Sequence, residues 1–191
     1  MRQAHYSVDP LILNRWSSRA MSGEDVAEEE LMSLFDAARW APSAFNEQPW
    51  RFVYVRKGTE QWDNIFSTLV EFNQSWVKNA SVMVAIISSK NSSHNDKPFK
   101  THSFDTGAAW QNLALQAMAN GLVCHGMSGF DFDAATSALG ISDNFELHMI
   151  AAIGKPGDKE KLPFDLQERE VMSSRKDLAE FVFEGKFDYS K

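Results

Sequence analysis

Residues 41–50, which read Ala-Pro-Ser-Ala-Phe-Asn-Glu-Gln-Pro-Trp, constrain the fold more than any other part of the chain. A helical pattern precedes them and a strand pattern follows them, so they connect two elements. A plain connection needs only a few turn residues. Here Ser43, Asn46 and Gln48 add hydrogen-bonding groups that suit the polar rim of a flat ring. The alternative interpretation is a helix C-terminal turn whose amides cap the backbone.

Length and composition indicate a soluble globular protein. The 191 residues can form one domain with its own core, and we expect a single domain over residues 1–191. The net charge of −7 argues against general nucleic-acid binding. Cys124 is the single cysteine, which excludes an intrachain disulfide and fits a reducing compartment. The N-terminus shows no signal peptide, and the longest apolar run, residues 82–87, is too short to cross a bilayer. We therefore expect a cytoplasmic protein.

Apolar spacing and turn signals predict several helices and strands. Helices are expected at residues 10–14, between a capping signal at 22–25 and Pro42, and at 61–72, 105–120 and 133–139. Strands are expected at residues 51–56, 82–88, 122–125 and 147–153. Residues 88–100 read as a loop or lid, and the aromatic segment 178–187 needs a surface to pack on. Helices mixed with a few separated strands indicate an α+β fold.

Arg15, Ser17 and Arg19 stand two residues apart near the N-terminus. In an extended segment such residues point to one side. Two forked guanidinium groups and a hydroxyl would then suit a phosphate and the polar edge of a ring. The alternative is a solvated basic turn after the first short helix.

The Arg-x-Ser-x-Arg motif at 15–19, followed by Ala-Pro-Ser-x-x-Asn-x-Gln-Pro-Trp at 41–50, resembles the FMN-dependent nitroreductase family. Asn73 before a buried strand, Met-Ser-Gly at 127–129 and the late Arg175 continue the similarity. The resemblance covers residues 8 to 190. It implies a small, mainly antiparallel central sheet flanked by helices, in an intertwined homodimer whose C-terminal segment reaches the partner.

The resemblance also implies tightly bound FMN, held by two groups of residues. The group for the chain's own flavin is Arg15, Trp16, Ser17, Arg19, Asn73, Met127, Ser128, Gly129 and Arg175. The group for the partner's flavin is Pro42, Ser43, Ala44, Asn46 and, more weakly, Gln48. In the first group the arginines would hold the phosphate and the pyrimidine side, Asn73 the pyrimidine edge, and the backbone of Ser128 and Gly129 would face flavin N5.

The implied reaction takes hydride from NADH or NADPH and passes it, by a ping-pong mechanism, to nitroaromatics, quinones or similar conjugated acceptors. Two alternatives remain: a flavin-dependent reductive dehalogenase or dehydrogenase on the same fold, and a flavin-binding protein without turnover. Ser173 replaces a lysine of many relatives, and Trp76 replaces a basic residue of some. The nicotinamide preference therefore stays open. Trp76 and residues 88–100 are expected to shape the substrate pocket.

Other kinds of site lack their motifs. The chain has no Gly-x-Gly-x-x-Gly and no P-loop. Its central histidines, His94, His102, His125 and His148, show no metal-ligand spacing, so no metal is expected. Cys124 lies in an apolar stretch and is expected to pack rather than react.

Overall fold

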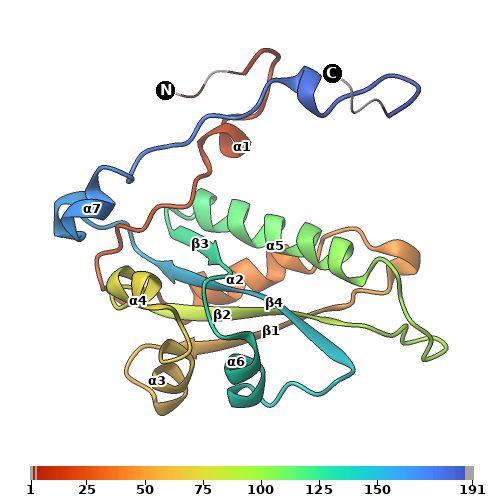
Figure 1. The fold of residues 1–191 in the computed structure, drawn as a ribbon, viewed down its shortest axis with the longest axis horizontal. Helices are drawn as coiled ribbons and strands as arrows, with labels where there is room; N and C mark the ends of the chain where they lie inside the picture. The colour runs from red at the N-terminus through yellow and green to blue at the C-terminus, as the bar shows by residue number, and fades with distance from the viewer. Residues whose placement is uncertain (1, 3, 188–191) are drawn as a thin grey trace.

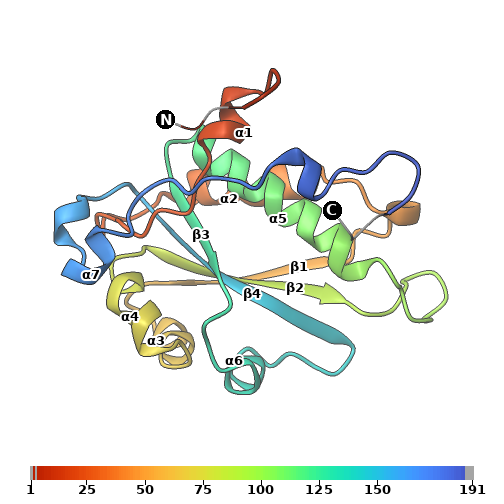
Figure 2. The same ribbon diagram turned by 45° about the horizontal axis from the view of Figure 1, so that its top comes forward.

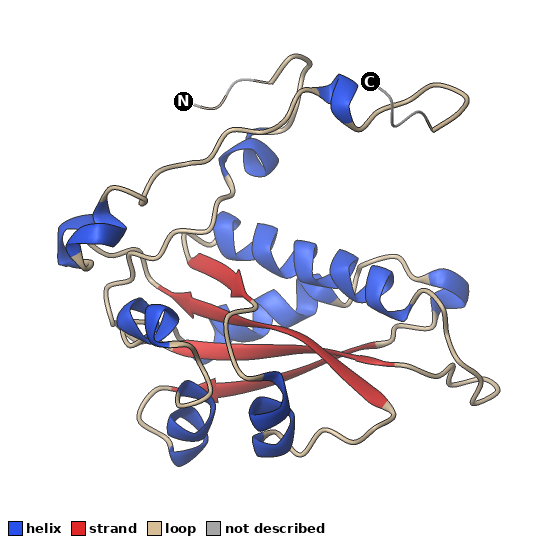
Figure 3. Cartoon of the chain, viewed as in Figure 1, coloured by secondary structure: helices blue, strands red, loops and turns tan. Residues whose placement is uncertain are grey.

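The computed structural model describes residues 2 and 4–187, and its centre is a four-stranded antiparallel sheet. The strands are β1 (Trp50–Arg56), β2 (Val82–Ser89), β3 (Val123–Met127) and β4 (Phe145–Gly154), in the spatial order β1-β2-β4-β3. Each pair is antiparallel. The sequence patterns predicted these four strands. The α+β fold with a small antiparallel sheet is confirmed (Figures 1 and 3).

Two long helices, α2 (Glu28–Ala38) and α5 (His102–Ala119), cover one face of the sheet (Figure 1). In α2, Leu31 and Leu34 are fully buried, and they join a core with Leu113 of α5 and the alternate side chains of β2. The helix begins after Ala27 rather than at the expected capping signal. There the Glu30 carboxylate accepts a hydrogen bond from the Ala27 backbone at 3.0 Å.

Three shorter helices, α3 (Glu60–Phe66), α4 (Glu71–Val77) and α6 (Phe132–Ala138), cover the opposite face. The sequence predicted one helix over residues 61–72, and that prediction is wrong. Leu69 forms a bridge with Phe130, and the Val70 backbone donates to the Gly129 carbonyl at 3.1 Å. These contacts to a distant segment replace the helical hydrogen bonds and break the helix between residues 67 and 70.

The N-terminal segment is fixed to the end of β4 by backbone contacts. Ser22 donates to the Lys155 carbonyl at 3.0 Å, and Gly157 donates to the Ala20 carbonyl at 2.9 Å. A Cβ on Gly157 would lie 2.3 Å from the Met21 carbonyl carbon, so only glycine fits this close approach. The pairing holds residues 15–19 beside the sheet, after helix α1 (Pro10–Asn14).

The remaining helices are short: α7 (Phe164–Gln167) and the 3₁₀ turns η1 (Ala44–Asn46), η2 (Lys159–Lys161) and η3 (Leu178–Glu180). The C-terminal segment runs past α1 along the outside of the fold (Figures 1 and 2). Its Phe181 is 56% exposed and its Phe187 is 73% exposed, so this chain leaves the aromatic segment largely uncovered. None of the described helices is long and apolar enough to cross a membrane.

Candidate functional site

Three arginines from distant parts of the chain gather near the N-terminal helix. Burial, and then the charge of Arg175, lower the pKa of both Arg2 and Arg15. Among the described residues, none of the three forms an ion pair with a carboxylate. Arg2 and Arg15 are half-buried and Arg175 is exposed. Unpaired arginines that repel one another favour an anion between them. The sequence predicted Arg15 and Arg175 here but missed Arg2, whose place in the cluster depends on backbone contacts.

Those backbone contacts make Arg2 a tie between the two chain segments that carry the other arginines. Its guanidinium donates to the Arg15 carbonyl at 2.8 Å, the Leu13 carbonyl at 3.1 Å and the Ser173 carbonyl at 3.0 Å. A hollow of about 740 Å³ opens beside them. It is lined by Arg2, His5, Leu13, Trp16, Lys176 and residues 170–175. The predicted residues Trp16 and Arg175 therefore share one hollow, and Ser17 Oγ lies 3.5 Å from the Arg15 guanidinium.

Arg19 has a different environment from Arg15. Its guanidinium lies 3.9 Å from the Glu170 carboxylate and 5.9 Å from the Phe72 ring centre. Glu170 is buried and also accepts hydrogen bonds from the Ser18 hydroxyl and from the backbone of Arg19 and Ala20. Arg15, Ser17 and Arg19 were expected to converge on one point, and this expectation is wrong for Arg19. Arg19 is directed toward α4 because Glu170, 151 residues away, fixes its backbone.

Beyond Phe72, residue Asn73 on α4 meets the loop after β3. The Asn73 amide donates to the Gly129 carbonyl at 2.8 Å. Within the described chain, the backbone N–H groups of Ser128 and Gly129 donate to no protein acceptor. Met127, at the end of β3, is buried beneath this loop. Asn73, Met127, Ser128 and Gly129 thus lie together as predicted, and two backbone donors remain free for a ligand.

The loop at 42–48 is held in an unusual conformation. Phe45, Asn46 and Gln48 have φ angles of 55°, 56° and 50°, in the left-handed region that side chains rarely adopt. The Ser43 hydroxyl accepts from the Gln48 backbone at 3.0 Å, and the Ala44 backbone donates to the Asp105 carboxylate at 3.1 Å. The helix expected from residue 105 begins earlier, at His102, so Asp105 lies in the first turn of α5.

The strained conformation presents polar atoms to solvent. Asn46 and Gln48 are exposed and line a hollow of about 420 Å³ with residues 39–41. Pro42 is exposed, and Ser43 and Ala44 are half-buried. This hollow and the hollow beside Arg175 share no lining residue. In both Figures 1 and 2, the loop and the segment at 15–19 lie toward opposite ends of α5. One chain therefore carries two separate groups of predicted ligands.

Two residues behind the site are packed rather than reactive. Burial raises the pKa of the Cys124 thiol to about 12, so the thiol stays protonated. Trp76 is fully buried, with its ring centre 4.6 Å from that of His125. Trp76 was expected to shape a substrate pocket, and the structure corrects this, because a fully buried side chain lines no pocket here.

The model of the nitroreductase family matches residues 12–66 and 57–155, which together form most of the chain. The chain belongs to the nitroreductase family. A Streptomyces coelicolor protein assigned as an NADH dehydrogenase/NAD(P)H nitroreductase is 28% identical over 169 residues, which cover 78% of this chain and 85% of that protein.

Solved structures agree with the family. A crystal structure described as an oxidoreductase containing FMN is 49% identical, with a TM-score of 0.93, and covers 98% of this chain and 96% of its own. A nitroreductase from Desulfovibrio desulfuricans in complex with FMN is 24% identical, with a TM-score of 0.74, over 95% of this chain and all of its own. At 24% identity, the similarity to the Desulfovibrio structure supports the fold alone.

In this member of the nitroreductase family, a Gly129→Ala substitution is expected to disturb the loop after β3. A Cβ at residue 129 would lie 2.6 Å from the Asn73 amide nitrogen and 3.1 Å from Val70 Cγ2. Overpacking of this kind costs about 1–3 kcal/mol. Chemical denaturation should show the loss in the free energy of unfolding. The matched control is Gly107→Ala, because a Cβ at Gly107 meets nothing within 4 Å. Equal stability of both variants would contradict the packing seen at Gly129.

Proposed function

We propose that this chain is an FMN-dependent oxidoreductase that takes hydride from NADH or NADPH and passes it to a conjugated electron acceptor. The observation that carries the proposal is the cluster of Arg2, Arg15 and Arg175. It combines mutual repulsion, partial burial of Arg2 and Arg15, and no carboxylate partner among the described residues. The names of the Streptomyces relative and of the 49% identical structure support the nicotinamide and the flavin.

The residues present fit the parts of FMN in order along the chain's surface. The arginine cluster suits the phosphate, because guanidinium groups donate forked, charge-assisted hydrogen bonds. Arg19 follows, with its charge partly balanced by Glu170. Asn73 and the free N–H groups of the loop after β3 come next and suit the polar edge of the ring system.

When bound, FMN would supply the ring atom that accepts and then gives up hydride. The chain's contribution is to bind, orient and polarise. The backbone donors of Ser128 and Gly129 would hold the ring face beside the incoming substrate. Arg19 would place positive charge near the ring, where it favours an electron-rich state. Cys124 is excluded as a proton donor because its thiol is buried and has a pKa raised to about 12.

The loop at 42–48 would complete the site of a second chain. Ser43, Asn46 and Gln48 lie away from the arginine cluster of their own chain, so they would contact the flavin of a partner. The exposed aromatic residues Phe181 and Phe187 would pack on that partner. A homodimer with two FMN sites follows from this arrangement.

Reductant and acceptor would bind in turn at the same exposed side of the flavin, which predicts ping-pong kinetics. Nitroaromatics and quinones are the expected acceptors, because both accept electrons into a conjugated system. Purified protein should be yellow, lose its flavin absorption on anaerobic addition of NADH or NADPH, and regain it with a nitroaromatic or a quinone. A colourless protein that takes up no added FMN would overturn the cofactor. A yellow protein that oxidises neither nicotinamide with any acceptor would overturn the reaction.

A further inference from the structure

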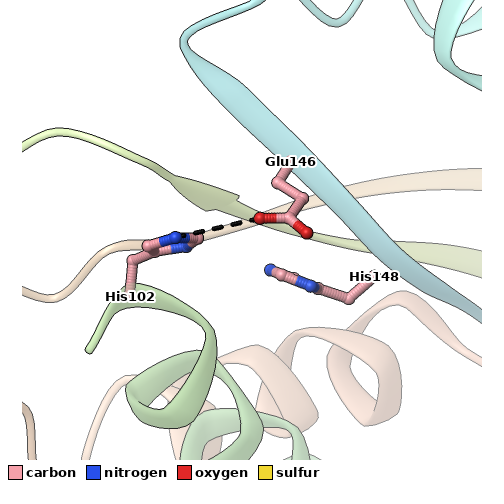
Figure 4. Close-up of side chains that lie close together, drawn as sticks. All are labelled: His102, Glu146 and His148. Carbon is pink, nitrogen blue, oxygen red and sulfur yellow. Dashed lines mark ion pairs between the residues drawn. The ribbon is translucent and has the colours of Figure 1, made fainter. Parts of the chain in front are cut away.

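His102, Glu146 and His148 form a cluster outside the proposed flavin site (Figure 4). It lies where β4 begins, at the end of the sheet away from α7 (Figure 1). One potential ligand atom from each residue lies within 4.8 Å of the other two. His102 Nε2 and the Glu146 carboxylate are 3.8 Å apart. We propose that these three side chains bind a divalent first-row transition metal such as Zn²⁺. The proposal does not depend on the flavin.

Glu146 and His148 stand two residues apart in β4, so strand alternation directs both side chains to one face of the sheet. Ile86 pairs with Met149, but its neighbour Ile87 pairs with Leu147, so His148 is an extra residue in β4. Such a residue is left without a direct partner on the neighbouring strand. Figure 4 shows His148 beside Glu146 and the first turn of α5. Bulges of this kind are common next to functional sites.

Ser88 supports both histidines from beneath. Its hydroxyl oxygen is fully buried and lies 2.7 Å from His102 Nδ1 and 2.7 Å from His148 Nε2. When His102 Nδ1–H and His148 Nε2–H both donate to this oxygen, the lone pairs of His102 Nε2 and His148 Nδ1 stay available for an ion. Histidines that bind metals usually donate their other N–H group to a partner of this kind, which fixes the ring.

The exposure of the side chains suits two different roles for the ligands. The His102 side chain is 17% exposed, whereas that of Glu146 is 50% exposed. The rigid histidines would therefore set the position of the ion, and the mobile carboxylate would close on it. Zinc sites hold their ligand atoms about 3.3 Å apart, so separations within 4.8 Å would need to shorten by no more than about 1.5 Å.

Two histidines and one carboxylate are a ligand set used by zinc and by ferrous iron, with further positions left for exogenous ligands. A hollow of about 520 Å³ opens beside His102 and is lined also by Lys90, Lys100 and Asp143. The two lysines outnumber the one carboxylate, which favours an anion or hydroxide as the additional ligand. The ion would also link β4 to the first turn of α5, from which Asp105 holds the loop at Ala44.

The test uses untagged, flavin-loaded protein that has been treated with a chelator and titrated with Zn²⁺ against a chromophoric chelator. Wild type is expected to bind one Zn²⁺ per chain and to melt at a higher temperature with it. Glu146→Gln keeps shape on a half-exposed side chain and should weaken binding at least tenfold. The double variant H102Q/H148Q should abolish binding. The control, His94→Gln, alters a histidine that faces Glu47 outside the cluster and should bind as wild type does.

Titration with Co²⁺ gives a second readout, because its visible absorption reports coordination by nitrogen and the number of ligands. Wild type should develop this absorption, and Glu146→Gln, whose folding is not at risk, should lose it or change it. The proposal is overturned if wild type binds Zn²⁺ no more tightly than H102Q/H148Q does. It is also overturned if His94→Gln loses as much affinity as Glu146→Gln, since binding would then be general surface binding. In either case the cluster is a hydrogen-bond network only.

Discussion

Replacement of Arg15 and Arg175 together by alanine is expected to yield colourless protein that retains its fold. Each guanidinium would donate a charge-assisted hydrogen bond to the phosphate, and each such bond contributes about 1.5–3 kcal/mol. The loss corresponds to a weakening of FMN binding by roughly tenfold to a hundredfold per arginine. Fluorescence titration of apoprotein with FMN measures the dissociation constant. Circular dichroism checks that the fold is retained. The stability of the fold should rise, because the repulsion between the two charges is removed.

Lys57→Ala is the matched control, since it removes one positive charge from an exposed turn that does not line the hollow. This control should bind FMN as wild type does. The FMN affinity of Arg2→Ala should lie between that of Lys57→Ala and that of R15A/R175A. Arg2 belongs to the cluster and also ties the Arg15 and Ser173 segments together by donating to their carbonyls. The assignment of the phosphate site fails if the double variant R15A/R175A purifies fully yellow.

Glu170→Ala is expected to be the most destabilising single substitution near the site. The Glu170 carboxylate accepts from the Ser18 hydroxyl and from two backbone N–H groups, and it faces the Arg19 guanidinium. Its removal leaves the Ser18 hydroxyl and the Arg19 backbone N–H without this acceptor, and Arg19 without its counter-charge, while the Ala20 N–H keeps the Ser18 hydroxyl oxygen. Breaking a buried pair of this kind costs about 3–5 kcal/mol. Urea denaturation should show that loss in the free energy of unfolding.

Two further variants separate the role of the charge from the role of the acceptor. Glu170→Gln keeps one acceptor oxygen and should lose less stability than Glu170→Ala. Glu168→Ala changes an exposed acid two residues away and should stay within about 0.5 kcal/mol of wild type. If Glu170→Ala is as stable as Glu168→Ala, the carboxylate does not organise the segment at 15–19.

Local patterns in the sequence predicted most of the fold. The four strands were recognisable from alternation or from continuous apolar runs, and α2 from the spacing of Leu31, Leu34 and Ala38. The motif at 41–50 marked a loop of unusual polarity, and the structure adds the reason for it. Three residues of that loop have positive φ angles, which periodicity does not reveal.

Contacts between distant residues account for what the sequence did not predict. The predicted helix at 61–72 is broken because Leu69 and Val70 bond to the loop near Gly129. Glu170 controls Arg19 from 151 residues away, and no local pattern connects them. His102 is likewise distant in the chain from Glu146 and His148, and only the fold brings the three side chains together. Spacing rules for metal ligands therefore missed the cluster.

The central claim is that each FMN site needs two chains, one that supplies the arginines and one that supplies the loop at 42–48. The variant R15A/R175A lacks the arginine half of its site. The variant N46D/Q48E carries isosteric changes at exposed positions of the loop at 42–48. These changes add negative charge to the loop half and remove two amide donors. Aspartate tolerates the positive φ of Asn46. Each variant alone should form dimers with little or no FMN.

The most direct measurement is the FMN content of heterodimers made from these two chains and purified through two different tags. Such a heterodimer contains one site with both halves intact and one site with both halves altered. The account predicts one FMN per heterodimer, with turnover close to half that of the wild-type dimer. A heterodimer as empty as its two parents, or an N46D/Q48E dimer that keeps both FMN molecules at full affinity, would contradict it.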